Sequence, residues 1–246
     1  ILAGDHVLQP GMDRCTLKQA FDSGWCASLP ASCSGECMSK VQFSTKERIL
    51  DAAETLFALY GFGGTSLRQV TSQADVNIAA VNYHFGSKEN LVNEVFRRRM
   101  DEMSAQRLAR LETAVKTDPT NLEVVLAAFV EPALAMAQDR HGGGAFIRVI
   151  ARAYAEKNEG LRRFLSEQYG HVLREFAKAI SGCMPGLSKE ELYWRLDFLA
   201  GALTYAMADF GMIKRPSGVS EVDHRNRAAQ ELIRFAAAGF KAGKIN

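Results

Sequence analysis

The residues best suited to do chemistry lie in one short stretch, VNIAAVNYHFGSKENL at residues 76–91. Its middle part is long enough for barely two turns of helix, and it ends on Phe85 and Gly86 before a new helix begins at once. Tyr83 and His84 place hydrogen-bonding groups on this short helix, although packing alone does not require them. Such groups suit phosphate oxygens, which fix the register of a protein on DNA without reading its sequence.

The two faces of the short helix predict different partners. At 100° per residue, Ile78, Val81 and Phe85 share one face, which we expect to pack on the two preceding helices. The opposite arc carries two small residues, whose methyl groups suit contact with thymine methyls, and its border carries an amide that can pair with adenine. These three residues are Ala79, Ala80 and Asn82.

Helix N-termini on either side of the short helix add binding capacity for phosphate. Lys88 lies in the first turn of the helix that follows, where free backbone N–H groups and the helix dipole favour an anion. The helix that begins after Ser66 offers the same arrangement, with Thr65 and Arg68 beside it, and Asn77 can cap the short helix while contacting DNA. Each residue is also explained singly as a cap, a domain contact or a solvated charge, and only their combination favours DNA binding.

The elements that must position these residues are helical throughout. Apolar residues recur at three- and four-residue steps from residue 44 onward, and capping boxes open helices at Ser44, Ser66 and Ser188. Alternating strand patterns and internal repeats are absent, so the sequence predicts an all-α fold of about nine helices. The expected helices span about 44–60, 66–74, 78–85, 87–116, 121–138, 144–157, 159–182, 189–212 and 222–241.

The sequence divides into three parts, two helical and one without a helical pattern. Residues 38–88 predict a helix-turn-helix domain, because a three-residue turn joins two helices of the right lengths. Residues 89–246 predict a larger helical bundle. Residues 1–37 lack both a basic segment and a sustained apolar core, so we expect a disordered extension, from an upstream start or a vector, and no secretory signal.

The composition excludes several classes of protein. With 47% hydrophobic and 24% charged residues, the chain is ordinary for a globular protein, and no apolar run is long enough to span a membrane. The formal net charge of +2 means that any nucleic-acid surface must be local. Four of the five cysteines precede residue 38 and form only a weak zinc pattern, so we expect no metal, no cofactor and a reduced, cytoplasmic protein.

Residues 44–96 resemble the N-terminal domain of the tetracycline-repressor (TetR) family of one-component regulators. The resemblance lies in the segments ILDAAETLF, YGFGGTSL and NYHFGSKENL. It implies a homodimer of Ω-shaped helical subunits, in which residues 89–246 form a divergent domain for effector binding and dimerisation. The implied groove-facing residues are Asn77, Ile78, Ala79, Ala80 and Asn82, and the implied backbone contacts are Thr65, Ser66, Tyr83, His84 and Lys88.

The same resemblance bears on the operator, the DNA site that such a regulator would bind. A twofold dimer places its two recognition helices on successive turns of the major groove, so we expect a palindrome with half-sites about 34–36 Å apart, or multiples of that distance. Ala80 and Asn82 depart from the family pattern, in which a hydroxyl and an aromatic residue are frequent at these positions. The operator sequence of a relative is therefore not carried over to this chain.

Residues 144–210 resemble a TetR branch that includes regulators of fatty-acid degradation, through segments such as AFIRVIARAYAE and LSKEELYWRLDFLAGALTYAM. This resemblance implies a long-chain fatty acid or its coenzyme A thioester as the effector. From the residues themselves, we expect an apolar effector to bind in a cleft between helices. The candidate cleft residues are Phe129, Phe146, Arg148, Val149, Arg152, Tyr169 and Phe176.

Arg148, Arg152 and Glu156 share one helix face in this region and allow two interpretations. The arginines can pair with a carboxylate or phosphate on an amphipathic effector. Alternatively, the three residues form a surface row or contact the long linking helix, and we favour this second interpretation.

The last two expected helices carry apolar faces and small residues, which allow close packing against a second copy of the chain. In the family this helix pair forms the dimer interface. The candidate interface residues are Trp194, Leu199, Leu203, Phe235 and Phe240.

The residues also leave two functions of other classes open. A helical enzyme that processes lipid-like molecules is weakly indicated, since His141, His171 and His224 have no nucleophile or metal partner at motif spacing. An architectural DNA-binding protein would need neither a pocket nor an effector. We expect a non-enzymatic regulator.

Overall fold

The computed structural model describes residues 44–137, 143–208 and 214–243, and in these ranges it contains helices and no strand. The predicted all-α class is confirmed, and the expected helix ends agree with the observed ones to within one residue, except that the helix expected to reach residue 212 ends at Met207. The extension expected over residues 1–37 lies outside the described residues. The helices are α2 (Thr45–Tyr60), α3 (Leu67–Ala74), α4 (Ile78–Phe85), α5 (Lys88–Thr117), α6 (Leu122–Ala137), α7 (Gly143–Glu156), α8 (Glu159–Cys183), α9 (Lys189–Met207) and α10 (Glu221–Lys241).

Side-chain caps set where most of these helices begin. Ser44, Ser66 and Ser188 form complete capping boxes, in which the serine hydroxyl accepts from a backbone N–H of the first turn and a Glu or Gln side chain returns to the serine N–H. Asn77 and Ser87 cap α4 and α5 with a single side-chain bond each. Local sequence thus fixes where α4 begins and where the next helix, α5, takes over from it.

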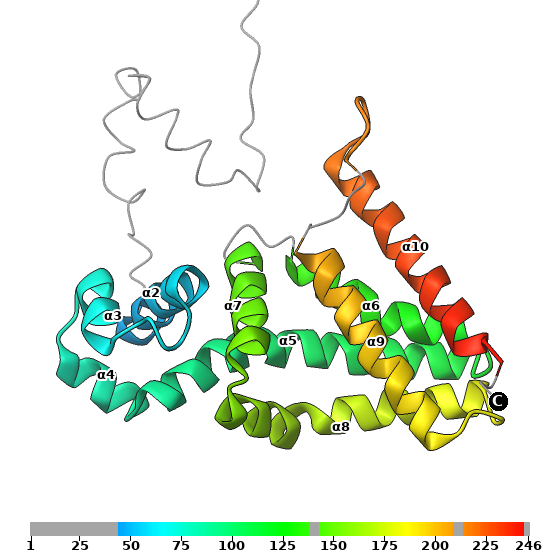
Figure 1. Cartoon of the computed structure of the whole chain (residues 1–246), viewed down its shortest axis with the longest axis horizontal. Coiled ribbons are helices and arrows are strands. Elements are labelled where there is room, and N and C mark those ends of the chain that lie inside the picture. Colours follow the sequence, from blue (N-terminus) through cyan, green and yellow to red (C-terminus); the bar gives the residue numbers. More distant parts are fainter. Residues whose placement is uncertain (1–43, 138–142, 209–213, 244–246) are drawn as a thin grey trace, which may run out of the picture. The chain divides into compact units, whose positions relative to one another are not determined.

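Helices α2, α3 and α4 pack with the first turns of α5 around one apolar core (Figure 1). Phe57 and Val70 are fully buried there, and Val81 and Phe85 point inward from α4 as predicted. Ile78 was predicted on the same inward face but is 46% exposed. As the first residue of α4, it lies at the end of the helix and is not covered as Val81 is.

A buried carboxylate fastens α2 to the long helix α5. The Glu54 side chain is 3% exposed and forms ion pairs with Arg98 and, at 3.1 Å, with Arg99. Arg98 also pairs with Asp51 at 2.6 Å. Separation of α2 from α5 here would leave a buried charge uncompensated, which is costly. The cluster therefore holds α5 against the helix-turn-helix unit.

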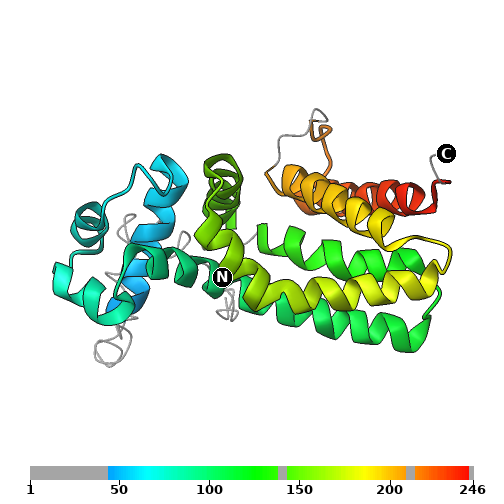
Figure 2. The ribbon, with the colours of Figure 1, turned by 60° about the horizontal axis from the view of Figure 1, so that its bottom comes forward.

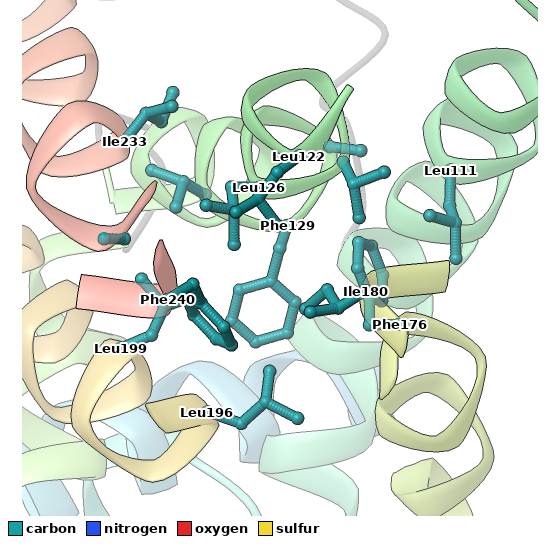
Figure 3. Packing of buried hydrophobic residues seen from close by; sticks show 14 of the residues in the cluster. Leu111, Leu122, Leu126, Phe129, Phe176, Ile180, Leu196, Leu199, Ile233 and Phe240 are labelled. Atoms are coloured by element: carbon teal, nitrogen blue, oxygen red, sulfur yellow. The ribbon is translucent and has the colours of Figure 1, made fainter. Parts of the chain in front are cut away.

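The larger core lies between α5, α6, α8, α9 and α10, of which α5, α6 and α8 run side by side (Figure 2). Figure 3 shows Phe129 from α6 in the middle of this core, with its ring centroid 5.1 Å from that of Phe176. Pro132 is buried inside α6, five residues before the helix ends at Ala137. None of the described helices combines the length and the hydropathy that a membrane span requires.

Helix α7 belongs to the first core as well as to the bundle. Phe146 and Val149 are fully buried with the residues of the helix-turn-helix unit, and the Phe146 ring centroid lies 5.2 Å from that of Phe96. The predicted boundary between residues 88 and 89 therefore divides the sequence but not the packing. Helices from both sides of it share one core.

Candidate functional site

The outer face of α4 is an exposed surface of aromatic, amide and methyl groups. Tyr83 is 85% exposed, and its ring meets that of His84 edge-on, with 5.1 Å between the centroids. The remaining predicted groove-facing residues are exposed or half-buried on the same short segment: Asn77, Ile78, Ala79, Ala80 and Asn82. The side chains that sequence reasoning singled out are thus accessible together, and their contact with DNA stays a prediction.

Two cations flank this surface without carboxylate partners. Arg68 is exposed on the first turn of α3, and Lys88 is half-buried at the start of α5. Neither forms an ion pair with any residue in the described part of the chain. Their charges are therefore available to phosphates, as is the positive end of the α5 dipole.

Thr65 does not belong to this surface, and we correct the prediction of a side-chain contact to DNA. Its side chain is buried, and its hydroxyl lies 2.8 Å from the Gly61 carbonyl oxygen and 3.2 Å from that of Leu56. Carbonyls at and beyond the end of a helix lack the full set of helical partners. Thr65 supplies a donor to the carbonyl of the C-cap residue Gly61 and to that of Leu56 in α2, and closes the turn between α2 and α3.

A cavity of about 740 Å³ opens between α5, α6, α7, α8 and α9. Its wall is mainly apolar and rich in methionine, a flexible side chain that adapts to the shape of a ligand. The methionines are Met100, Met103, Met136 and Met207. The volume is within the range of about 300–1,000 Å³ that is typical of small-molecule sites.

The predicted cleft residues are only partly those of the cavity. Phe129 lies on its wall, whereas Phe176 packs behind Phe129 in the bundle core. Phe146 and Val149 fill the first core, and the Tyr169 hydroxyl donates to Asp101 at 2.7 Å. Arg148 is exposed on α7. Periodicity identified the apolar helix faces, but which space stays unfilled depends on how the faces meet.

Burial, together with the hydrogen bond to Asp101, raises the pKa of Tyr169. The phenol therefore stays protonated and acts as a donor that ties α8 to α5. This is a structural contact between helices, and we remove Tyr169 from the cleft residues.

A buried arginine in the cavity was missed by sequence reasoning. The Arg107 side chain is 8% exposed, its Nε–H donates to the Phe129 carbonyl oxygen at 2.8 Å, and its guanidinium carbon lies 3.8 Å from the Phe129 ring centroid. Burial lowers the pKa of Arg107 to about 10, which still leaves it charged at neutral pH. A signal was present, because Arg107 lies four residues from both Met103 and Leu111 on the apolar stripe of α5.

The other face of α7 contacts the helix-turn-helix unit through hydrogen bonds. The Glu156 carboxylate accepts from the backbone N–H groups of Phe62 at 2.9 Å and Gly63 at 3.1 Å. Arg152 donates to the Leu59 carbonyl oxygen at 3.2 Å. Arg152 and Glu156 therefore contact α2 and the turn that follows it, whereas the favoured interpretation expected a surface row or a contact with the linking helix.

Gly61 makes this contact possible. Its φ of +76° favours glycine, and a Cβ added there would lie 2.1 Å from the Glu156 carboxylate oxygen. On its remaining side α7 lines the cavity with Ile150, Ala153 and Tyr154. One helix thus touches both the cavity and the turn that precedes α3.

The predicted dimer residues divide into exposed and buried ones. Trp194 and Phe235 are 56% and 71% exposed on α9 and α10, and Phe198, which sequence reasoning missed, is 67% exposed and stacks on Trp194. By contrast, Leu199, Leu203 and Phe240 are buried in the bundle core of the subunit. We therefore correct the candidate surface to Trp194, Phe198 and Phe235.

The residues considered for enzymatic chemistry do not assemble into a site. No group of three or more His, Cys, Asp or Glu side chains that could hold a metal occurs within the described residues. His171 is exposed and His224 is half-buried on different helices, and His141 lies outside the described residues. Burial raises the pKa of Cys183, whose Sγ donates to the Pro119 carbonyl oxygen at 3.3 Å, so a reactive thiolate is disfavoured there.

Comparison with protein families gives two matches. Residues 49–95 match the family described as bacterial regulatory proteins, tetR family, and residues 127–239 match the tetracyclin repressor-like C-terminal domain. The first match contains α3 and α4, and the second contains most of the bundle. The first match thus includes the exposed surface of α4, and the second includes α7, α8 and α9, which line the cavity.

Curated relatives are named as HTH-type transcriptional regulators. The chain is 30% identical over 149 residues to the HTH-type transcriptional regulator LmrA of Bacillus subtilis, covering 59% of this chain and 77% of that protein. It is 30% identical over 155 residues to the HTH-type transcriptional repressor NicS of Pseudomonas putida, covering 60% of this chain and 68% of that one. The match to the regulator YttP of B. subtilis is 42% identical over 60 residues but spans only 29% of YttP.

Solved structures share the fold. A tetR-family transcription regulator from Shewanella sp. PV-4 superimposes with a TM-score of 0.56 at 22% identity, covering 80% of this chain and 96% of that one. A transcriptional regulator from Saccharomonospora viridis, solved in complex with choline, gives a TM-score of 0.53 at 21% identity and covers 77% and 95%. At these identities the likeness supports the architecture alone.

Replacement of Thr65 by valine tests the structural role of its hydroxyl. We expect Thr65→Val to lower the free energy of unfolding by about 1–3 kcal/mol, because buried carbonyls lose their donor while the side-chain shape is kept. Urea unfolding followed by circular dichroism measures the change. The exposed Thr113→Val serves as the control and should change stability by less than about 0.5 kcal/mol. Unaltered stability of Thr65→Val with weakened DNA binding would reverse our correction.

Replacement of Glu156 by alanine tests the contact between α7 and the turn after α2. Loss of the carboxylate removes the acceptor of the Phe62 and Gly63 N–H groups, so we expect these two amides to exchange with solvent at least about tenfold faster. Hydrogen exchange followed by NMR measures the rates. Glu167→Ala, at an exposed position of α8, is the control and should leave both rates unchanged. Equal rates in Glu156→Ala and the wild type would refute the contact.

Proposed function

Since this chain belongs to the tetracycline-repressor (TetR) family of helix-turn-helix transcriptional regulators, we propose that it is a homodimeric repressor that a small apolar effector releases from a palindromic operator. The observation that carries the proposal is the outer face of α4, where polar and small side chains are exposed between two cations that have no ion-pair partner in the described part of the chain. A relative of similar length, NicS, is named a repressor. We further propose that the protein acts in the cytoplasm and is not an enzyme.

On DNA, α4 would lie in the major groove as the recognition helix. Ala79 and Ala80 allow close approach to base edges, and Asn82 can form hydrogen bonds with them. Tyr83 and Lys88 would contact phosphates on either side, together with Arg68 at the start of α3. Ser66 and Asn77 already hold their helix caps, so their side chains would add contacts only with remaining acceptor or donor capacity.

DNA titration tests this surface. We expect Tyr83→Ala and Lys88→Ala each to weaken operator binding about tenfold, and Lys88→Ala to reduce the slope of log affinity against log salt concentration by about 1, because one phosphate contact is lost. The operator is the duplex that the wild-type protein selects from a randomised library, and fluorescence anisotropy measures affinity. Lys178→Ala, an exposed cation on α8, is the control. Wild-type affinity in both Tyr83→Ala and Lys88→Ala would reject α4 as the DNA-reading helix.

Dimerisation would use the exposed aromatic residues of α9 and α10. Trp194, Phe198 and Phe235 form large apolar surface that an isolated subunit would leave in water, and such aromatic anchors contribute much of the free energy of protein association. Because a twofold interface pairs each patch with its own copy, a few residues suffice to build it.

Charge introduced on this patch tests the dimer. We expect Phe235→Glu to raise the dimer dissociation constant at least about 30-fold, since a buried aromatic anchor contributes about 2–4 kcal/mol and a carboxylate would face its own copy. Sedimentation velocity across a range of concentrations measures the constant. The control Tyr60→Glu alters an exposed aromatic residue of α2 and should leave the dimer intact. A variant Phe235→Glu that dimerises like the wild type would exclude this surface.

The effector would bind in the cavity that α5 and α7 both line. Binding shifts operator affinity only to the extent that the effector prefers one arrangement of the helices over the other. Helix α7 can transmit a change from the effector site to the DNA-binding helices, because it faces the cavity and binds the turn before α3 through Glu156. The resemblance to regulators of fatty-acid degradation makes a long-chain fatty acid or its coenzyme A thioester our proposed effector.

A further inference from the structure

We propose that the cavity binds an amphipathic ligand with a carboxylate head group, which pairs with the guanidinium of Arg107 while the apolar chain lies along the methionine-rich wall. This inference rests on the proposed function and specifies the chemical class of the effector. It specifies the free acid, whose carboxylate ends the alkyl chain, over neutral derivatives and over the coenzyme A thioester, in which an uncharged thioester carbonyl takes the place of that carboxylate.

The first argument is the unused capacity of the guanidinium. Arginine carries five N–H donors, and only the Nε–H of Arg107 has a partner among the described residues, the Phe129 carbonyl. The side chain lies on the cavity wall and is 8% exposed. No carboxylate of the described chain forms an ion pair with it. A buried cation that lacks a counter-ion is costly, and a planar carboxylate could accept two parallel hydrogen bonds from its free edge.

The second argument is the placement of the other charges around the cavity. Arg162 is 82% exposed by side chain and pairs with Glu159 at 3.8 Å. Lys157 and Asp197 are likewise exposed. Water solvates these groups, so they need no ligand and do not neutralise the arginine. Among the described lining residues, Arg107 is therefore the buried charge that a ligand would meet beside the apolar wall.

A purely structural role for Arg107 explains less. Pro132 lacks an N–H and disturbs the hydrogen bonds of α6, so a side-chain donor to the nearby Phe129 carbonyl stabilises that turn. This role needs one donor and no charge, and glutamine could fill it. The Phe129 ring under the guanidinium stabilises the cation, which favours a permanently charged residue at this position.

The proposal also predicts which ligands are rejected. A quaternary ammonium ligand such as choline, which the structure of the S. viridis regulator contains, would meet like charge at Arg107. An uncharged amphiphile would fill the apolar part of the cavity but leave the guanidinium without a partner. Affinity should therefore depend on head-group charge when the alkyl chain is held constant.

The test uses the full chain and three probes with the same alkyl chain: dodecanoate, dodecanol and dodecyltrimethylammonium. By isothermal titration calorimetry, we expect wild-type protein to bind dodecanoate at least about tenfold more tightly than dodecanol, and the ammonium most weakly. Arg107→Gln keeps a donor for the Phe129 carbonyl, so it should lose at least about tenfold in dodecanoate affinity while its dodecanol affinity stays the same. Arg110→Gln, an exposed arginine on the same helix, is the matched control and should keep the preference.

Several results would overturn the inference. They are equal binding of dodecanoate and dodecanol by the wild type, binding of neither, or a preference for the acid that survives in Arg107→Gln. Tight binding of dodecanoyl-coenzyme A that is indifferent to Arg107→Gln would overturn it too. Should Arg107→Gln fail to fold, Arg107→Lys keeps the charge, and the comparison of probes on wild-type protein still decides.

These measurements need no DNA, so the ligand inference can be refuted while the proposed repressor function stands, and the reverse. If the acid binds through Arg107 but the protein binds no operator, or never releases it, the repressor function is wrong and the ligand class stands. If dodecanol releases the operator as well as dodecanoate does, the repressor function stands and the carboxylate inference is wrong.

Discussion

The structure depends on one uninterrupted helix that belongs to two cores. Helix α5 has 30 residues and is therefore about 45 Å long. Phe96 packs in the core of the helix-turn-helix unit, Met103 packs in the bundle core, and Met100 touches both. Because α5 begins at Lys88 and later lines the cavity, the candidate DNA surface and the candidate effector site are built on the same rigid element.

The helix-turn-helix unit is attached to the bundle by a second helix as well as by α5. The ion pairs of Glu54 hold α2 to α5 on one side, and the carboxylate of Glu156 holds the turn after α2 from α7. Two attachments on different helices resist rotation about either one. The close approach at Gly61, where any larger residue would meet Glu156, indicates that this geometry constrains the sequence at the turn.

Sequence patterns predicted the features that depend on residues close in the chain. They missed the features that depend on which surfaces other segments cover. Capping serines and apolar periodicity gave the helices and the exposed face of α4, because both act within one or two turns. They placed Thr65 outside and Ile78 inside, and the structure reverses both, because neighbouring segments decide what is covered. A cleft between helices was expected, but of its predicted residues only Phe129 lines the cavity, because an unfilled space is a property of several helices together and no single helix contains it. Arg107 was missed although its place on the apolar stripe of α5 was a signal in the sequence.

The hydrogen bonds around the cavity determine which wall can move when the cavity fills. Arg107 joins α5 to the Phe129 carbonyl on α6 through Nε, and a carboxylate at the other edge of the guanidinium would leave that bond intact. The α5–α6 wall is therefore expected to hold its register. Helix α7 is apolar toward the cavity and hydrogen-bonded toward the turn before α3, so displacement of α7 would pass directly to the helix-turn-helix unit. On this argument, effector binding would act on α3 and α4 through α7, with α5 as the fixed reference.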